Sequence, residues 1–339
     1  MADRAAHRAA QPDAAPAIGT PGADGASTLA AVAPSATRRS TLTTADLLRA
    51  ILDDKVVLVA LTFIVLIVGA AVFADYVAPH DPLAQSIRTR MKPPMTPAVQ
   101  PDAPPYLLGT DQLGRDVLSR LIFGARISLG VGILTALVSG SVGVTLGLIA
   151  GFYRGHLDDL IMRLVDLQMS LPGLLLALFV LYALGPSVPN LVLVMVITRW
   201  MVYARITRGM MLSLRERPFV EAARAIGCSD RRLMLVHMLP NVFSPIVVLA
   251  TLEIATMMLA LAALDFLGFG IQPPDSSWGL ILAQGRESIT TAWWLVTFPG
   301  LAIMLTALSF NILATWVRVV TDPVNSWRWV RRGAARTAA

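Results

Sequence analysis

Charged side chains are scarce in this sequence. Of its 339 residues, 15% are Asp, Glu, Lys or Arg and 55% are apolar, and the mean hydropathy is +0.64. Soluble domains carry about 25% charged residues. A chain with so little polar surface cannot cover a globule that faces water on all sides, so lipid must be part of its solvent.

Cysteine and lysine are nearly absent as well. The one cysteine, Cys228, excludes an intrachain disulfide and a cysteine-based metal cluster. The two lysines follow Asp54 and Met91, so neither belongs to the Gly-Lys-Ser/Thr sequence of a phosphate-binding loop. No pair of histidines has metal-ligand spacing. We therefore expect no catalytic residue, no cofactor and no metal, and we expect ATP hydrolysis to occur on a separate chain.

The sequence is instead rich in long apolar runs. A membrane-spanning helix needs roughly 20 mostly apolar residues. The third run is amphipathic at its start and purely apolar only from 171 to 184, the fourth contains Arg199, and the fifth contains Glu253. The pattern predicts an all-α, polytopic membrane protein with about six transmembrane helices, at 56–74, 127–151, 163–184, 188–203, 242–264 and 293–316.

The arginines predict the orientation. Cytoplasmic loops are enriched in Arg and Lys, and here basic residues cluster before the first span, between the fourth and fifth, and after the sixth. With six spans these segments share one side, so both termini are expected in the cytoplasm, and the basic charge indicates a lipid bilayer rather than nucleic acid. The segment 75–126 opposes this assignment, because it would lie outside and yet carries six Arg or Lys residues.

The long basic loop between the fourth and fifth predicted spans has a readable local pattern. Residues 221–226 (EAARAI) favour a helix, and Gly227 suits the left-handed position that ends one. Ser229 or Asp230 can cap a second short helix, which Pro240 is expected to end before the fifth span. Such an amphipathic hairpin at a membrane face is suited to lie in a groove of a cytoplasmic partner.

This loop resembles the coupling loop of binding-protein-dependent ABC importer permeases, which have Glu-Ala-Ala, three residues, Gly, and Leu-Pro after eleven more. The ending that starts at His237 is similar to the dipeptide, oligopeptide and nickel branch. The resemblance implies a type I ABC importer transmembrane domain in the bacterial cytoplasmic (inner) membrane. It also implies an ATPase-coupling loop at 213–240, with Glu221, Ala222, Ala223, Gly227, His237, Leu239 and Pro240 as its candidate residues.

Two further segments carry the same resemblance. Residues 109–120 are similar to the segment before the second span of C-type subunits of dipeptide and oligopeptide permeases, and residues 266–279 to the loop after their fifth span. From the residues alone, the first segment is predicted to be a capped amphipathic helix with ion pairs Asp111–Arg115 and Asp116–Arg120. It would anchor the second span or contact a substrate-delivering protein. Its apolar stripe would comprise Leu113, Val117, Leu118, Leu121 and Ile122.

Small residues recur in the second predicted span. Ser139, Gly143, Gly147 and Gly151 are spaced by four and lie on one helical face. Such a stripe lets another helix approach closely. We expect it to pack within this subunit, with a gating contact as the alternative.

Ionisable residues in the fifth span need partners. Glu253, in mid-span, is expected to pair with Arg199 or with the sister subunit, or alternatively to line the pore and attract a peptide amino terminus. Asp265, near the outer end, is expected to be solvated, and His237 to pack within its loop rather than to bind metal.

The chain is expected to comprise a disordered cytoplasmic tail (1–45), a first transmembrane helix and extracytoplasmic loop (46–124), the ABC importer transmembrane domain (125–322) and a cytoplasmic tail (323–339). The resemblance implies partners: a sister permease in a heterodimer, two cytoplasmic ATPase subunits and an extracytoplasmic solute-binding protein. The function implied is that of a non-enzymatic permease subunit, half of a pore that imports di- or oligopeptides or a related small solute, such as a nickel chelate or glutathione.

Two other classes of membrane protein fit this sequence less well. A secondary transporter driven by an ion gradient would show inverted repeats and paired broken helices, and no convincing repeat relates the two halves of the chain. A membrane-embedded enzyme would need a clustered nucleophile, base or metal set within the spans, where polar residues are sparse.

Overall fold

The computed structural model describes residues 51–98 and 103–321, so the tails expected at 1–45 and 323–339 lie outside the described residues. The described part is all-α, as predicted, apart from isolated bridges Thr96–Tyr106 and Thr110–Asp116. The α-helices are α3 (Lys55–Val72), α4 (Ala74–Val77), α5 (Val117–Tyr153), α6 (Gly155–Met169), α7 (Gly173–Leu184), α8 (Val188–Arg215), α9 (Pro218–Ala225), α10 (Asp230–Arg232), α11 (Leu239–Phe266), α12 (Trp278–Gly285) and α13 (Trp294–Thr321). Short 3-10 turns η2 (Ile87–Thr89) and η4 (Arg286–Ser288) and a π-helical stretch η3 (Leu233–Met238) complete them.

Five helices of the described chain are long and apolar enough to cross a membrane, or six if α6 and α7 together form one span. The spans at 56–74, 127–151, 188–203, 242–264 and 293–316 are confirmed as helices, although α5 starts earlier and α8 ends later than predicted. The third span is not one straight helix, because α6 and α7 meet at 87°. Pro172 lacks an N–H and disfavours helical geometry at the preceding residue, so the helix breaks there.

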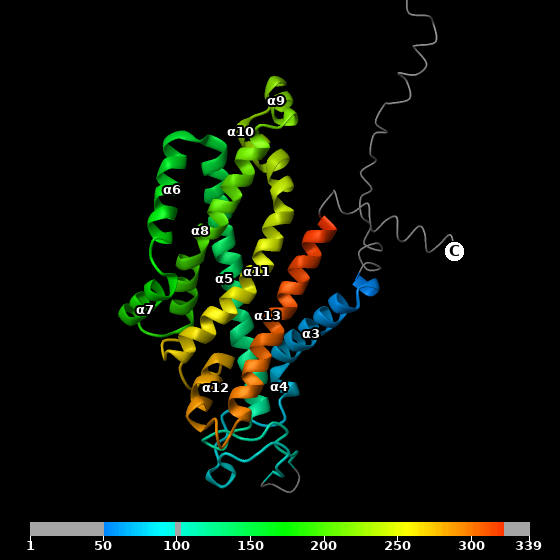
Figure 1. The fold of residues 1–339 in the computed structure, drawn as a ribbon, viewed down its shortest axis with the longest axis vertical. Helices are drawn as coiled ribbons and strands as arrows, with labels where there is room; N and C mark the ends of the chain where they lie inside the picture. The colour runs from blue at the N-terminus through cyan, green and yellow to red at the C-terminus, as the bar shows by residue number, and fades with distance from the viewer. Residues whose placement is uncertain (1–50, 99–102, 322–339) are drawn as a thin grey trace, which may run out of the picture. The chain divides into compact units, whose positions relative to one another are not determined.

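The glycine stripe shows that the α6–α7 pair carries the chain back along the bundle, as a sixth span would. Gly143 lies against Tyr203, Gly147 against Ala204 and Thr207, and Gly151 against Met211. The residue numbers of the contacting positions increase in the same direction on both helices, so α5 and α8 run parallel. Helices α6 and α7 must therefore carry the chain back between them (Figure 1). The prediction of about six crossings therefore holds.

The same contacts confirm that the stripe packs within the subunit. A Cβ atom built on Gly147 would lie 2.5 Å from the carbonyl oxygen of Ala204 and 2.8 Å from Cβ of Thr207. The α8 backbone is thus in direct contact with this face of α5, and no side chain larger than hydrogen fits between them.

Replacing Gly147 with leucine should separate α5 from α8. We expect a loss of about 1–3 kcal/mol of stability, measured as a lower thermal unfolding midpoint of the purified protein in detergent. Gly130→Leu on the same helix is the control, because a Cβ there meets nothing within 4 Å. Equal midpoints for the two variants would contradict this packing.

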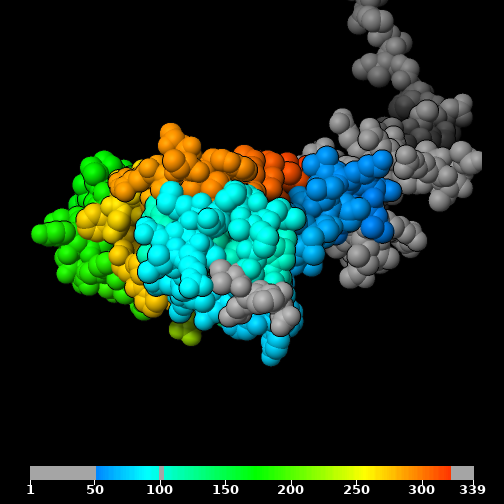
Figure 2. All heavy atoms as spheres, turned by 90° about the horizontal axis from the view of Figure 1, so that it is seen from below, coloured from blue at the N-terminus to red at the C-terminus, as the bar shows by residue number. Residues whose placement is uncertain are grey.

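The two ends of the bundle differ. Helices α9 and α10 lie at the end where α8 finishes and α11 starts (Figure 1). The segments 78–98 and 103–116 and the region around α12 cover the opposite end, as Figure 2 shows from that side. We call these the hairpin end and the capped end.

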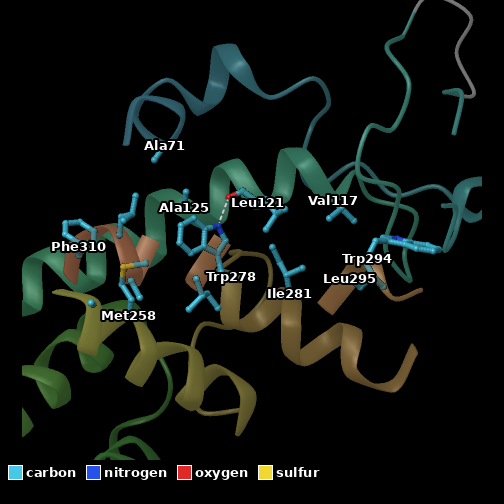
Figure 3. Packing of buried hydrophobic residues seen from close by; sticks show 14 of the residues in the cluster. Ala71, Val117, Leu121, Ala125, Met258, Trp278, Ile281, Trp294, Leu295 and Phe310 are labelled. Atoms are coloured by element: carbon cyan, nitrogen blue, oxygen red, sulfur yellow. Dashed lines mark hydrogen bonds between the residues drawn. The ribbon is translucent and has the colours of Figure 1, made fainter. Parts of the chain in front are cut away.

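Two tryptophans hold the capped end to the bundle. Trp278 is buried, and its Nε1 donates to the carbonyl oxygen of Leu121 at 2.9 Å, the dashed line in Figure 3. Trp294 is also buried and donates to the carbonyl oxygen of Thr110 at 3.1 Å. With Phe310 and other buried residues they form one apolar cluster that joins α5, α11, α12 and α13.

The helix predicted for residues 109–120 is correct only from Val117 onward. Residues 110–116 form a turn in which Gly114 has φ +77°, and the Asp111 carboxylate accepts the backbone N–H groups of Leu113 (2.8 Å) and Arg115 (2.9 Å). An aspartate side chain that bonds local backbone in this way competes with a helix. Leu113 is accordingly exposed and does not belong to the predicted apolar stripe.

One of the two predicted ion pairs here is confirmed and the other is wrong. Arg115 Nε lies 2.7 Å from Asp111 Oδ2, as expected. Arg120 pairs with Asp111 at 2.6 Å rather than with Asp116. Asp116 is occupied as the N-cap of α5, where it accepts from the backbone N–H of Ser119 at 2.9 Å. The capping bond holds the Asp116 carboxylate against the backbone of the first helical turn, while Arg120 binds Asp111.

Asp265 is buried, so the expectation that it is solvated was wrong. Its carboxylate accepts from the backbone N–H of Ile271 at 2.6 Å and from the Ser277 hydroxyl at 2.7 Å. Cβ atoms built on Gly270 or Gly279 would collide with this carboxylate. Gly270 in the loop between α11 and α12 and Gly279 in the first turn of α12 therefore make room for the carboxylate that organises this loop.

Candidate functional site

The hairpin between α8 and α11 begins with helix α9, which has Pro218 at its first turn. Proline is favoured there because its missing N–H would have no partner in a helix anyway. Gly227 follows the helix with φ +80°. The N–H of Gly227 donates to Arg224 (2.9 Å) and the N–H of Cys228 donates to Ala223 (3.0 Å). These two bonds form a Schellman motif, which confirms the predicted helix stop.

The inner face of α9 is fixed to the transmembrane helices. Val220 is fully buried in a cluster with Phe152 of α5, Met211 of α8 and Val242 of α11. The guanidinium of Arg224 lies 5.8 Å from the centre of the Phe152 ring. A displacement of α9 would therefore be transmitted to the ends of α5, α8 and α11. The sequence pattern did not single out Val220 as the anchor.

The outer face of α9 and the turn after it are free in the described chain. Glu221, Ala222 and Gly227 are exposed, and Ala223 is half-buried. Ile226 at the tip is 86% exposed.

The second half of the hairpin differs from the prediction. Pro240 does not end a helix before the fifth span, because the chain passes from α10 through the π-helical η3 directly into α11, where Pro240 lies in the first turn. The wider π turn lets the helix continue although Pro240 supplies no N–H. Leu239 is half-buried, while Pro240 and His237 are exposed, so His237 does not pack within its loop as expected.

Glu253 forms an ion pair in the middle of the bundle. Its carboxylate accepts from Arg199 Nε at 2.8 Å and from Arg199 Nη2 at 2.7 Å. The pairing expected between these two residues is confirmed. It joins α8 to α11 with the bidentate geometry that makes Arg–carboxylate pairs strong. Whether Glu253 lines a pore stays a prediction.

Two more ion pairs were missed by sequence reasoning. Arg208 Nε lies 2.5 Å from Asp158 of α6, and Arg205 pairs with Asp166 of α6. Both arginines were assigned to a cytoplasmic loop, because the fourth span was expected to end at 203, yet α8 continues to Arg215. The aspartates at 158 and 166 lie two helical turns apart, and this spacing was the available signal. Among the described residues, no group of three or more His, Cys, Asp or Glu could hold a metal.

Two protein families match the chain. Residues 143–323 match the family described as binding-protein-dependent transport system inner membrane component. Residues 43–94 match the N-terminal TM domain of oligopeptide transport permease C. The first match contains the hairpin, α11 and α13, and the second contains α3.

Curated relatives match at high identity over most of their length. The di/tripeptide transport system permease protein DppC of Pseudomonas aeruginosa is 43% identical over 80% of this chain and 88% of its own. The dipeptide transport system permease protein DppC of Escherichia coli is 42% identical over 80% of this chain and 89% of its own. The probable D,D-dipeptide transport system permease protein DdpC of Escherichia coli is 36% identical, over 77% and 85%.

A solved structure described as an inward facing conformation of the MetNI methionine ABC transporter has a TM-score of 0.47 and 17% identity, and covers 59% of this chain and 97% of that chain. This likeness is too weak to carry an argument. The family match over residues 143–323 and relatives above 40% identity over 80% of the chain do carry one. This multi-pass membrane protein belongs to the family of binding-protein-dependent transport system inner membrane components.

Proposed function

We propose that this chain is the permease subunit of a peptide-type ABC importer in the bacterial inner membrane. It forms half of the pore that moves di- or oligopeptides into the cytoplasm, and it carries no ATPase site of its own. A sister permease supplies the other half, two cytoplasmic ATPase subunits supply the energy, and an extracytoplasmic solute-binding protein delivers the cargo.

The single observation that carries this proposal is the hairpin at 216–240. It has an inner face anchored by Val220 to three long helices and an outer face that leaves Glu221, Ala222 and Ile226 exposed. An ATPase subunit (the motor subunit) that binds the outer face and moves would displace α5, α8 and α11 together. In this scheme Glu221, Ala222, Ala223 and Gly227 meet the motor, while His237, Leu239 and Pro240 form the junction with α11.

The cargo assignment is supported by the relatives, which are described as permeases for dipeptides, di/tripeptides and D,D-dipeptides. The orientation is supported by charge. Arg217, Arg224, Arg231 and Arg232 all lie at the hairpin end, and positive residues favour the cytoplasm. The capped end then faces the binding protein, and α3 starts and α13 ends on the cytoplasmic side.

Co-purification tests the proposal. The tagged chain, purified in mild detergent from its native host, should bring down a second permease and ATPase subunits. Reconstituted in liposomes with the binding protein, this complex should take up a labelled dipeptide only when ATP is supplied on the hairpin side. Uptake driven by an ion gradient in the absence of any second polypeptide would refute the proposal and favour a secondary transporter.

A further inference from the structure

The Arg199–Glu253 pair lies deep in the membrane. Helix α11 has 28 residues, so it is about 42 Å long at 1.5 Å per residue. Glu253 is near its middle. A hydrocarbon core of about 30 Å placed anywhere along the helix leaves Glu253 roughly 8 Å or more from either surface.

Arg199 is the member of this pair that reaches the surface of the subunit. Its side chain is 26% exposed, while that of Glu253 is 7% exposed. Its Nε and Nη2 bind Glu253, and Nη1 has no hydrogen-bond partner among the described residues. Charged groups at this depth face protein or water rather than lipid tails. The surface at which Arg199 emerges is therefore not a lipid-facing surface.

Further polar groups continue from Arg199 toward the hairpin end. The Trp200 indole donates to Gln168 at 2.9 Å, then Arg205 pairs with Asp166, and Arg208 with Asp158. The Arg205 and Asp166 side chains are 46% and 68% exposed. We call these residues of α6 and α8, together with Arg199 and Glu253, the polar face.

We propose that the polar face lines the aqueous path for the substrate and that the free Nη1 of Arg199 receives the substrate carboxylate. This inference rests on the proposed function, because it takes the cargo to be a peptide with a free carboxyl terminus. Glu253 is a positioning residue that holds the guanidinium by its other two nitrogens. Arginine suits the role because its planar fork has donors left after one bidentate contact.

The charge balance of the polar face fits a zwitterionic cargo. Arg199, Arg205 and Arg208 are each matched by a carboxylate, from Glu253, Asp166 and Asp158. A path lined by compensated charges of both signs can contact both the amino and the carboxyl end of a peptide. An uncompensated charge would bind the oppositely charged end much more tightly. Cargo that binds too tightly would not leave the path.

Cysteine accessibility in the assembled complex tests the path. Val202 and Ile206 lie one and two turns beyond Arg199 on the same face of α8, and Ile206 is 40% exposed. Each is replaced by cysteine in a Cys228→Ser background, which removes the one native thiol. A charged, membrane-impermeant methanethiosulfonate is added in the resting and nucleotide-trapped states, and labelling of this chain is followed by gel shift.

Leu66→Cys on α3 is the matched control, because Leu66 is 67% exposed on the most peripheral long helix. Thiols in hydrocarbon do not ionise and do not react. We expect Val202→Cys or Ile206→Cys to react at least about tenfold faster than Leu66→Cys in one of the two states. If neither reacts in any state while ATP-driven uptake is normal, the polar face is a dry contact with the sister permease and this inference fails, although the proposed function stands. Absence of ATP-driven uptake in the parent complex would refute the proposed function itself.

A charge swap tests the role of Arg199. In the double variant Arg199→Glu/Glu253→Arg the pair can still form, but its exposed member becomes acidic. We expect Arg199→Gln to lower the thermal unfolding midpoint and the double variant to restore it. Dipeptide uptake by the double variant should stay at least about tenfold below that of the parent, as expected for a lost charge-assisted hydrogen bond. Recovery of both midpoint and uptake would show that the pair is only a brace.

Arg199→Lys provides a second measurement for the case in which the double variant does not insert into the membrane. Lysine keeps the charge, but it cannot hold Glu253 with two nitrogens and offer a third to the substrate. Uptake should fall while the amount of assembled complex is unchanged. Uptake equal to that of the parent would overturn the assignment of Arg199 to the substrate.

Discussion

Gly227→Val is expected to abolish ATP-driven uptake while the protein still inserts and assembles. Gly227 has φ +80°, a conformation from which a β-branched side chain is strongly excluded. A Cβ there meets nothing within 4 Å, so no packing is lost and the effect comes from the backbone alone. Valine forces the turn to open, which breaks the bonds from Gly227 to Arg224 and from Cys228 to Ala223. The exposed face of α9 then no longer has one fixed orientation to which the ATPase subunit can bind.

The measurement is uptake of a labelled dipeptide by proteoliposomes, with immunoblots of the membrane fraction to quantify insertion. Gly227→Asn is the matched control, because asparagine tolerates the left-handed conformation far better than valine does. We expect the asparagine variant to retain most of its uptake. Normal transport by the valine variant would refute the assignment of Gly227 to the surface that meets the ATPase subunit. Loss of the protein from the membrane would instead show that the turn is needed for folding.

The turn at Gly227 could be predicted because its causes are local. A helix-favouring run and a glycine at the right position act within a few residues of one another. Ser229 stands at the N-cap of α10 as predicted, but its side chain makes no capping hydrogen bond. The existence of the spans was equally accessible, since each depends on the composition of one segment. The 87° bend in the third span and the length of α8 were not predicted. The glycine stripe of α5 was interpreted correctly for the same reason, because its four-residue period already defines a face.

The predictions that failed depended on contacts that helical spacing within one segment does not show. Asp265 was expected to be solvated because it stands near the end of a span, but Ser277 and the backbone of Ile271 satisfy it inside the protein. The i,i+4 spacing of Asp116 and Arg120 suggested a pair, yet Arg120 binds Asp111. Spacing alone cannot distinguish a helix from a turn when an aspartate has two ways to satisfy nearby backbone groups.

The arginines of α8 show a third kind of failure. Arg205 and Arg208 were counted as loop charges because a span was expected to end where charges begin. Their partners Asp166 and Asp158 are on α6, so the charges are compensated within the bundle and α8 can continue. Compensation by another helix cannot be seen in a window of one segment. The polar face therefore emerged only from the structure.

Asp111→Ala is expected to be strongly destabilising at the capped end. Asp111 is buried and is the shared partner of two buried arginines, Arg115 at 2.7 Å and Arg120 at 2.6 Å. Removing one partner of a buried pair leaves uncompensated charge and costs about 3–5 kcal/mol. The carboxylate also accepts two backbone N–H groups of the turn at 110–116, so the substitution removes the turn together with the charge.

The consequence should extend to α12, because Arg120 also donates to the side chain of Gln284 at 3.0 Å. Without Asp111 to hold Arg120, the contact between the start of α5 and α12 loosens. We expect a lower unfolding midpoint in detergent and faster hydrogen exchange in both 110–120 and 276–288. If hydrogen exchange becomes faster only in 110–120 and not in 276–288, Arg120 does not couple these two segments.

Asp75→Ala is the control for removing an acidic residue near the same end. Asp75 pairs with Arg126 at 3.0 Å, but both side chains are largely exposed. Exposed pairs contribute little because water screens them, so the midpoint should hardly change. If Asp111→Ala unfolds at the same temperature as Asp75→Ala, the buried cluster does not hold the capped end together. That end would then be held by its other contacts, which include the indole hydrogen bonds of Trp278 to Leu121 and of Trp294 to Thr110 across the same boundary.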